Sequence, residues 1–96
     1  MAEAEVEVRN PSGLHARPAA TFVRSASSFA SDVTVTNLTR DGSRSASAKS
    51  ILGVMGLVVA RGHRIRISAD GTDADEAVAR LTELVDGGLG EEIDAE

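Results

Sequence analysis

The chain has 96 residues, a formal net charge of −5 and no cysteine. Its length suits one small domain with a single core, and the lack of cysteine excludes disulfides and thiolate zinc sites. The negative charge and an aromatic content of 2% argue against direct nucleic-acid binding. No stretch of the sequence predicts a signal peptide or membrane insertion, so we expect a cytoplasmic protein.

The first two predicted elements are a strand and a helix. Val6 and Val8 alternate with charged residues, which is typical of a half-buried strand. A helix of about fifteen residues follows, because apolar residues recur at spacings of three and four. The predicted core face of this helix comprises Ala19, Phe22, Val23, Ala26, Phe29 and Ala30. Since Pro18 fits only in a first helical turn, His15 should lie near the N-cap and Arg17 in the first turn.

The middle of the chain predicts a hairpin and a short helix. Val33 and Val35 alternate with threonines and indicate a second strand. The Asp-Gly pair within residues 40–43 predicts a hairpin turn, and its partner strand is expected at about residues 43–48 despite weak propensity. A short helix should then extend from about Ser50, its N-cap, to Val58.

The last two predicted elements are again a strand and a helix. Ile65, Ile67 and Ala69 alternate with polar residues and indicate the last strand. The final helix is expected over about residues 73–86, ending at the glycine pair 87–88. It should bury Ala77, Val78, Leu81, Leu84 and Val85. The order βαββαβα favours one antiparallel sheet with helices on one face.

His15 is the candidate functional residue. A helix N-terminus offers backbone N–H groups and the positive end of the helix dipole, which suit an incoming phosphate. The dipole disfavours imidazolium and therefore favours a neutral, nucleophilic ring. The Arg17 guanidinium could then bind the oxygens of a transferred phosphate. Without further context, a histidine that merely begins a helix and faces solvent is the more common case.

Two motifs add that context. The run Gly-Leu-His-Ala-Arg-Pro-Ala at 13–19 resembles the active-site signature of the HPr family, the histidine-containing phosphocarriers of the bacterial phosphoenolpyruvate:sugar phosphotransferase system. The run Lys-Ser-Ile-Leu-Gly-Val-Met-Gly at 49–56 resembles the family's regulatory-serine segment. The resemblance implies an α+β open-faced β-sandwich, with a four-stranded antiparallel sheet covered on one face by three helices. Extra length near residues 39–45 leaves the register of the third strand open.

The resemblance also implies roles for individual residues. His15 would accept a phosphoryl group at Nδ1 from phosphorylated enzyme I and pass it to the IIA unit of a sugar permease. Arg17 would stabilise the phosphoryl oxygens, and the N–H groups of Ala16 and Arg17 would orient them. Partner docking is expected at Ala20, Arg24, Lys49, Ile51, Leu52 and Met55. We expect a monomeric carrier without enzymatic activity, metal or cofactor, formed by a single domain over 1–90 with an acidic, frayed tail over 91–96.

Alternatives remain open for the function. Ser50 could be only the N-cap of its helix, or it could be phosphorylated by an HPr kinase, which would weaken docking through its added charge. The chain could also be a regulatory binding module that acts on metabolic enzymes or a transcription regulator. In a nitrogen-related branch, the same chemistry would end on regulators instead of sugars.

The remaining ionisable residues predict no further site. His63 follows a glycine at the start of a strand and is expected to be an exposed turn residue. Asp70, Asp73, Asp75 and Glu76 lack the spacing and the glycine of a calcium loop. We expect them to cap the final helix and to complement its dipole.

Overall fold

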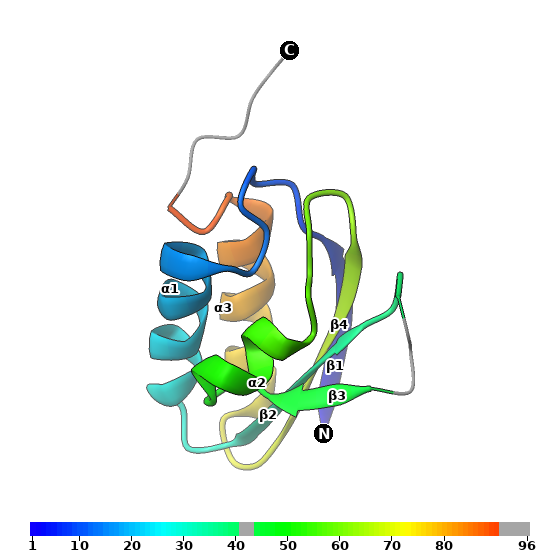
Figure 1. The fold of residues 1–96 in the computed structure, drawn as a ribbon. Coiled ribbons are helices and arrows are strands. Elements are labelled where there is room, and N and C mark those ends of the chain that lie inside the picture. The colour runs from blue at the N-terminus through cyan, green and yellow to red at the C-terminus, as the bar shows by residue number, and fades with distance from the viewer. Residues whose placement is uncertain (41–43, 91–96) are drawn as a thin grey trace.

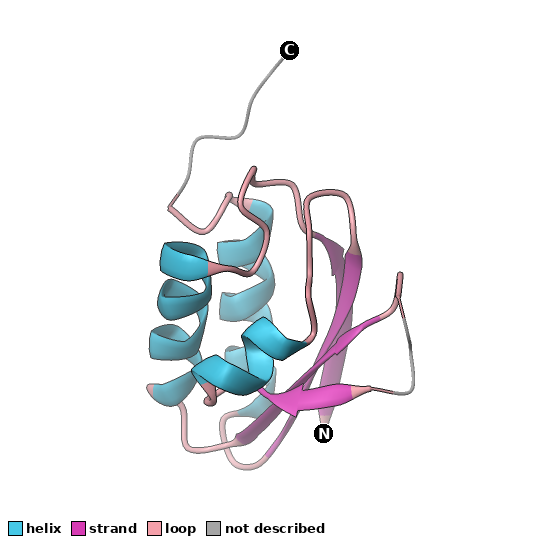
Figure 2. Ribbon diagram, in the orientation of Figure 1, coloured by secondary structure: helices cyan, strands magenta, loops and turns pink. Residues whose placement is uncertain are grey.

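The computed structural model describes residues 1–40 and 44–90; the predicted turn at 41–43 and the predicted tail at 91–96 lie outside the described residues. The elements follow the predicted order. They are β1 (Ala2–Glu7), α1 (Ala16–Ser27), β2 (Asp32–Asn37), β3 (Ser45–Ser47), α2 (Ile51–Gly56), β4 (Arg64–Asp70) and α3 (Ala74–Asp86). The strands pair antiparallel in the order β1-β4-β2-β3. Figures 1 and 2 show the three helices on one side of this sheet, which confirms the α+β open-faced sandwich.

The alternating pattern of β4 determines which face of the sheet the helices cover. Ile65 and Ile67 are fully buried under the helices, whereas Arg64 and Arg66 alternate with them along the strand. On β1, the Glu5 carboxylate lies 3.5 Å from an Arg66 guanidinium nitrogen and 3.9 Å from one of Arg64. Such exposed pairs contribute at most about 1 kcal/mol each. Burial of the apolar face therefore fixes the register of the central strand more strongly than the ion pairs do.

α1 is shorter than its predicted length. Phe22 is fully buried on its core face, as predicted. The helix ends at Ser27 because the Ser28 N–H and hydroxyl both bind the Ser25 carbonyl oxygen, the hydroxyl at 2.6 Å. The prediction that Phe29 and Ala30 lie on the core face of the helix is wrong. Phe29 follows the helix and is half-buried, and Ala30 is exposed.

The hairpin and α2 also differ from their predicted bounds. β3 is reduced to three residues, and its register with β2 is fixed by the pairs Thr34–Ser47, Val35–Ala46 and Thr36–Ser45. The Ser50 hydroxyl accepts a hydrogen bond from the Gly53 N–H at 3.1 Å, which confirms the predicted N-cap. α2 stops at Gly56, two residues before the predicted end at Val58. Val58 has a φ of +52°, which a right-handed helix does not allow.

α3 begins one residue after Asp73, and the predicted capping role of this carboxylate is wrong. Asp73 occupies the N-cap position, but its side chain makes no hydrogen bond to the helix. Instead, the carboxylate accepts hydrogen bonds from the Ala30 and Ser31 N–H groups, each at 2.9 Å, and from the Ser31 hydroxyl. These bonds, above all the one from the Ser31 hydroxyl, hold the pKa of Asp73 below its ordinary value. Asp73 therefore connects the start of α3 to the segment between α1 and β2.

The rest of α3 follows the sequence pattern closely. Asp75 and Glu76 occupy its first turn, where acidic side chains complement the helix dipole. The predicted core residues are buried except Leu84, which is half-buried. The helix ends at the predicted glycine pair, and Gly88 has a φ of +95° that favours glycine.

Candidate functional site

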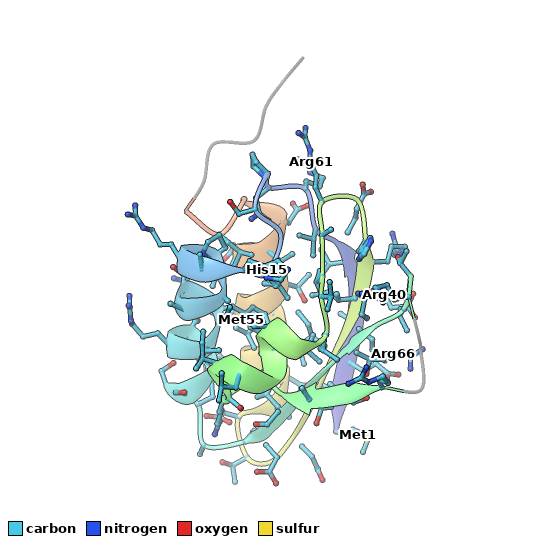
Figure 3. All side chains as sticks on the ribbon, viewed as in Figure 1. Met1, His15, Arg40, Met55, Arg61 and Arg66 are labelled. Atoms are coloured by element: carbon cyan, nitrogen blue, oxygen red, sulfur yellow. The ribbon has the colours of Figure 1, made fainter. Side chains whose placement is uncertain are left out.

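His15 lies at the N-cap of α1, as the sequence predicts. Its φ of −127° and ψ of 156° are extended, and its side chain makes no capping hydrogen bond to the helix. The residue is only half-buried, and Figure 3 shows it at the start of α1. The imidazole is therefore not used to stabilise the helix, and one side of it can meet a partner.

The two residues before His15 are anchored against the segment between α2 and β4. The Leu14 side chain is fully buried, and its N–H donates to the Val59 carbonyl oxygen at 3.0 Å. Gly13 has a φ of +59°, and a Cβ built on it would lie 2.3 Å from that same oxygen. The Asn10 side-chain amide in turn donates to the Gly13 carbonyl at 2.9 Å. Only a glycine allows the backbone to approach the Val59 carbonyl this closely.

The residue after His15 has an uncommon backbone conformation. Ala16 has a φ of +52°, in the left-handed region that costs a residue with a side chain about 1–3 kcal/mol. Leu14 and Pro18, two residues away on either side, are both buried. The sequence pattern contains no signal for this conformation, because alanine is not a residue that turns require.

An anion could bind where the backbone N–H groups of α1 begin. The first N–H groups of a helix have no acceptor within the helix, and Pro18 carries no N–H. Ala16 and Arg17 are exposed and belong to the first turn, beside His15. His15, the first backbone N–H groups of α1 and the exposed Arg17 thus lie at the same helix end, a setting that suits an anion.

The predicted docking residues lie on two helices that contact each other. α1 contributes Ala20, half-buried, and Arg24, exposed in the last turn. α2 contributes an apolar surface in which Leu52 is 81% exposed and Ile51 38%, with Met55 half-buried. Figure 1 shows α2 beside α1, and the two helices are in contact.

Lys49 differs from the other predicted docking residues. It is half-buried, and its ammonium donates to the Phe29 carbonyl oxygen at 2.8 Å. This bond connects the start of α2 to the residues that follow α1. The side chain therefore helps to hold the two helices together as well as adding positive charge to the surface.

His63 is not the exposed turn residue that the sequence predicts. It is half-buried, and its Nδ1 lies 3.1 Å from the Ala60 N–H nitrogen and 3.2 Å from Nδ2 of Asn37. Asn37 was not identified from the sequence. It is a buried polar residue at the end of β2, and its one sequence signal is that it ends the alternation of valine and threonine.

The described residues form neither a metal site nor a membrane-spanning helix. No group of three or more metal-ligating side chains is close enough there to hold a metal ion. Within the same ranges, 1–40 and 44–90, no helix has the length and apolar character needed to cross a membrane.

Comparison with known proteins gives one consistent result. The family model described as "PTS HPr component phosphorylation site" matches residues 2–86. The multiphosphoryl transfer protein of Haemophilus influenzae is 44% identical over 88 residues, which are 92% of this chain and 17% of that protein. The chain spans less than a quarter of each multiphosphoryl transfer protein that it matches.

Shorter relatives match along their whole length. The phosphocarrier protein HPr of Vibrio cholerae is 44% identical over 86 residues, covering 90% of this chain and 96% of that protein. The crystal structure of HPr-C-His from Thermoanaerobacter tengcongensis is 42% identical, with a TM-score of 0.87, covering 96% of this chain and 99% of that one. Sequence and fold therefore agree, and the chain belongs to the HPr family, the phosphocarriers of the phosphotransferase system.

Proposed function

We propose that this chain carries a phosphoryl group on His15 between phosphorylated enzyme I and the IIA units of sugar permeases, in the cytoplasm. The observation that carries the proposal is the position of His15 at the N-cap of α1, half-exposed and without a capping bond, inside the region matched by the phosphorylation-site model. A side chain with no structural hydrogen bond to the helix is available for chemistry.

Each transfer exchanges one bond to phosphorus for another. In the first transfer the electron pair of the His15 Nδ1 forms the new N–P bond, and the leaving atom of the donor takes the pair of the bond that breaks. In the second transfer the acceptor atom of the IIA unit forms the new bond to phosphorus, and Nδ1 takes back the pair of the N–P bond. The Arg17 guanidinium and the N–H groups of Ala16 and Arg17 balance the charge on the phosphoryl oxygens. Their contribution is moderate on an exposed surface, since a helix dipole is worth about 0.3–1 kcal/mol there. A carrier needs such moderate binding because it must release the group again.

The surface around His15 supports the choice of partners. Leu52 and Ile51 present apolar area on α2, and Arg17 and Arg24 add positive charge on α1. An apolar centre with a basic rim favours a partner surface that is apolar with acidic residues around it. We expect a small interface that dissociates quickly, since each partner must be exchanged for the next.

The experiment is a labelling assay with enzyme I and radioactive phosphoenolpyruvate. We expect label that is stable in alkali and lost in acid, that is absent from His15→Ala, and that forms much more slowly on Arg17→Ala. Arg80→Ala is the matched control, because Arg80 is also an exposed helix arginine, but it lies on α3 and pairs with Glu83. Label on a folded His15→Ala variant, or equal rates for the two arginine variants, would contradict the proposal.

A second candidate function is regulation through Ser50. The residue is exposed, and its hydroxyl accepts the Gly53 N–H at the start of the helix that carries Leu52. A phosphate there would add about 1.5–2 negative charges beside the apolar docking area. We expect Ser50→Asp, which keeps an acceptor for the cap, to raise the KM for enzyme I, while Ser50→Ala leaves it unchanged. Equal KM values for the two variants would count against this role.

A further inference from the structure

Asn37 joins three separate segments through a fully used side-chain amide. The residue is 2% exposed. Its Oδ1 accepts from the N–H groups of Thr39 and Arg40, at 3.1 and 3.4 Å. Its Nδ2 donates to the carbonyl oxygen of Leu57 at 3.1 Å, lies 3.5 Å from the carbonyl oxygen of Val58 and faces Nδ1 of His63 at 3.2 Å. An amide has two donor hydrogens and two acceptor sites, so both ends of this side chain have partners.

These contacts indicate which nitrogen of the His63 ring acts as the acceptor. Backbone N–H groups can only donate and backbone carbonyls can only accept, so the orientation of the Asn37 amide is fixed by its backbone partners. Its Nδ2 therefore faces His63 as a donor. The Ala60 N–H independently requires an acceptor at the same Nδ1. In this hydrogen-bond arrangement Nδ1 is the acceptor, and the tautomer that fits it carries its proton on Nε2.

The turn that His63 holds is the one that supports the residues before His15. Ala60, which donates to His63, directly follows Val59, whose carbonyl oxygen accepts the Leu14 N–H at 3.0 Å. The atoms that a Cβ on Gly13 would meet belong to the same two residues, Val59 and Ala60. Figure 1 shows the segment before α1 beside the segment between α2 and β4. A displacement of this turn therefore displaces Leu14 and, with it, the backbone of His15.

We propose that His63, through Nδ1 and together with Asn37, is a positioning residue for phosphoryl transfer: it holds the Val59–Ala60 backbone on which the residues before His15 rest. The inference rests on the proposed function of His15. Transfer depends on geometry steeply, since a misplacement of about 1 Å can cost up to about a hundredfold in rate. The docking residues on α1 and α2 are not part of this connection, so the effect should appear in kcat and not in KM.

The test compares three variants as acceptors from phosphorylated enzyme I. His63→Leu keeps an apolar side chain but removes the acceptor. His63→Asn places an oxygen at the same number of bonds from Cα as Nδ1, and so keeps the acceptor. Arg61→Gln changes an exposed residue of the same turn, labelled in Figure 3, that takes no part in these hydrogen bonds. We expect kcat to fall about tenfold in His63→Leu, to recover to within about twofold of wild type in His63→Asn, and to stay unchanged in Arg61→Gln, with similar KM values throughout.

A nitrogen-15 NMR spectrum of the wild-type protein at neutral pH adds a readout that needs no substitution. We expect His63 to show a protonated Nε2 and an unprotonated Nδ1. A proton on Nδ1, a wild-type kcat in folded His63→Leu, or no recovery in His63→Asn would each overturn the inference. If His63→Leu does not fold, the NMR signature of the wild type and the kcat of His63→Asn still test the inference. The two proposals fail differently, because a wild-type chain that takes no label at all contradicts the role of His15 and not that of His63.

Discussion

Gly13→Ala is the substitution that most directly tests how the residues before His15 are supported. Two costs add at this position. The φ of +59° costs an alanine about 1–2 kcal/mol. In addition, the new Cβ would lie 2.3 Å from the Val59 carbonyl oxygen and 2.9 Å from the Cα of Ala60. Both neighbours are backbone atoms, so the clash is relieved only by separating the two segments.

The cost of that separation can be estimated from the contacts it disturbs. Overpacking of this kind costs about 1–3 kcal/mol, and loss of the hydrogen bond from Leu14 to Val59 accounts for about 1 kcal/mol of it. An alanine also lowers the conformational entropy of the unfolded chain, which stabilises the folded state by about 0.4–1 kcal/mol and offsets part of this cost. We therefore expect Gly13→Ala to destabilise the protein by about 2–4 kcal/mol.

Gly62→Ala is the matched control for this prediction. Gly62 has a φ of +91°, but no atom lies within 4 Å of a Cβ built on it. The control therefore carries the conformational cost without the clash. In urea denaturation, we expect the free energy of unfolding of Gly13→Ala to be about 1–3 kcal/mol lower than that of Gly62→Ala. This difference corresponds to roughly 5–20 °C in Tm for a domain of this size. Equal stabilities, or a lower stability for Gly62→Ala, would refute the steric argument.

Four other substitutions test further features of the fold. Asp73→Asn should lower the free energy of unfolding at neutral pH. Because the folded-state pKa of Asp73 is lowered, the stability that the wild type gains from this carboxylate is complete above the ordinary pKa of 3.8 and is lost as the pH falls through the folded-state pKa. Denaturation of both proteins at several pH values checks this expectation. Ser50→Ala removes the cap of α2 and should cost about 1 kcal/mol in urea denaturation. Phe22→Ala should cost about 3–5 kcal/mol and Phe29→Ala clearly less, since only Phe22 is fully buried; similar losses would contradict the assigned end of α1.

The sequence predicts the helices and strands well because the buried face of each element produces a regular spacing of apolar residues. In β4 each second residue is apolar, and these are the residues that face the helices. In α1 the proline restricts the start of the helix, which is why the position of His15 could be predicted. The ends of the helices were less predictable. The Ser28 hydroxyl stops α1 within an apolar pattern that continues to Ala30, and periodicity does not reveal such a bond.

Contacts between segments that are distant in the sequence produce no such regular pattern. The hydrogen bonds of Asn37 reach residues 20 and 26 positions away, and Asp73 reaches residues more than 40 positions away. Each of these polar residues is common in loops, so composition gives no reason to expect it to be held by tertiary contacts. The positive φ of Ala16 is a similar case, because alanine has no intrinsic preference for this conformation that the sequence could reveal.

A phosphocarrier site has two requirements that conflict. The nucleophile must be exposed to meet large partners, yet its backbone must be fixed so that the phosphoryl group is received in one geometry. In this chain different residues meet the two requirements: His15 and Arg17 are accessible, while Leu14 before them and Pro18 after them are buried. The fixed part rests on the Val59 carbonyl, and hence on contacts made far from the reacting atoms. Substitutions that loosen this support should therefore slow phosphoryl transfer before they unfold the domain.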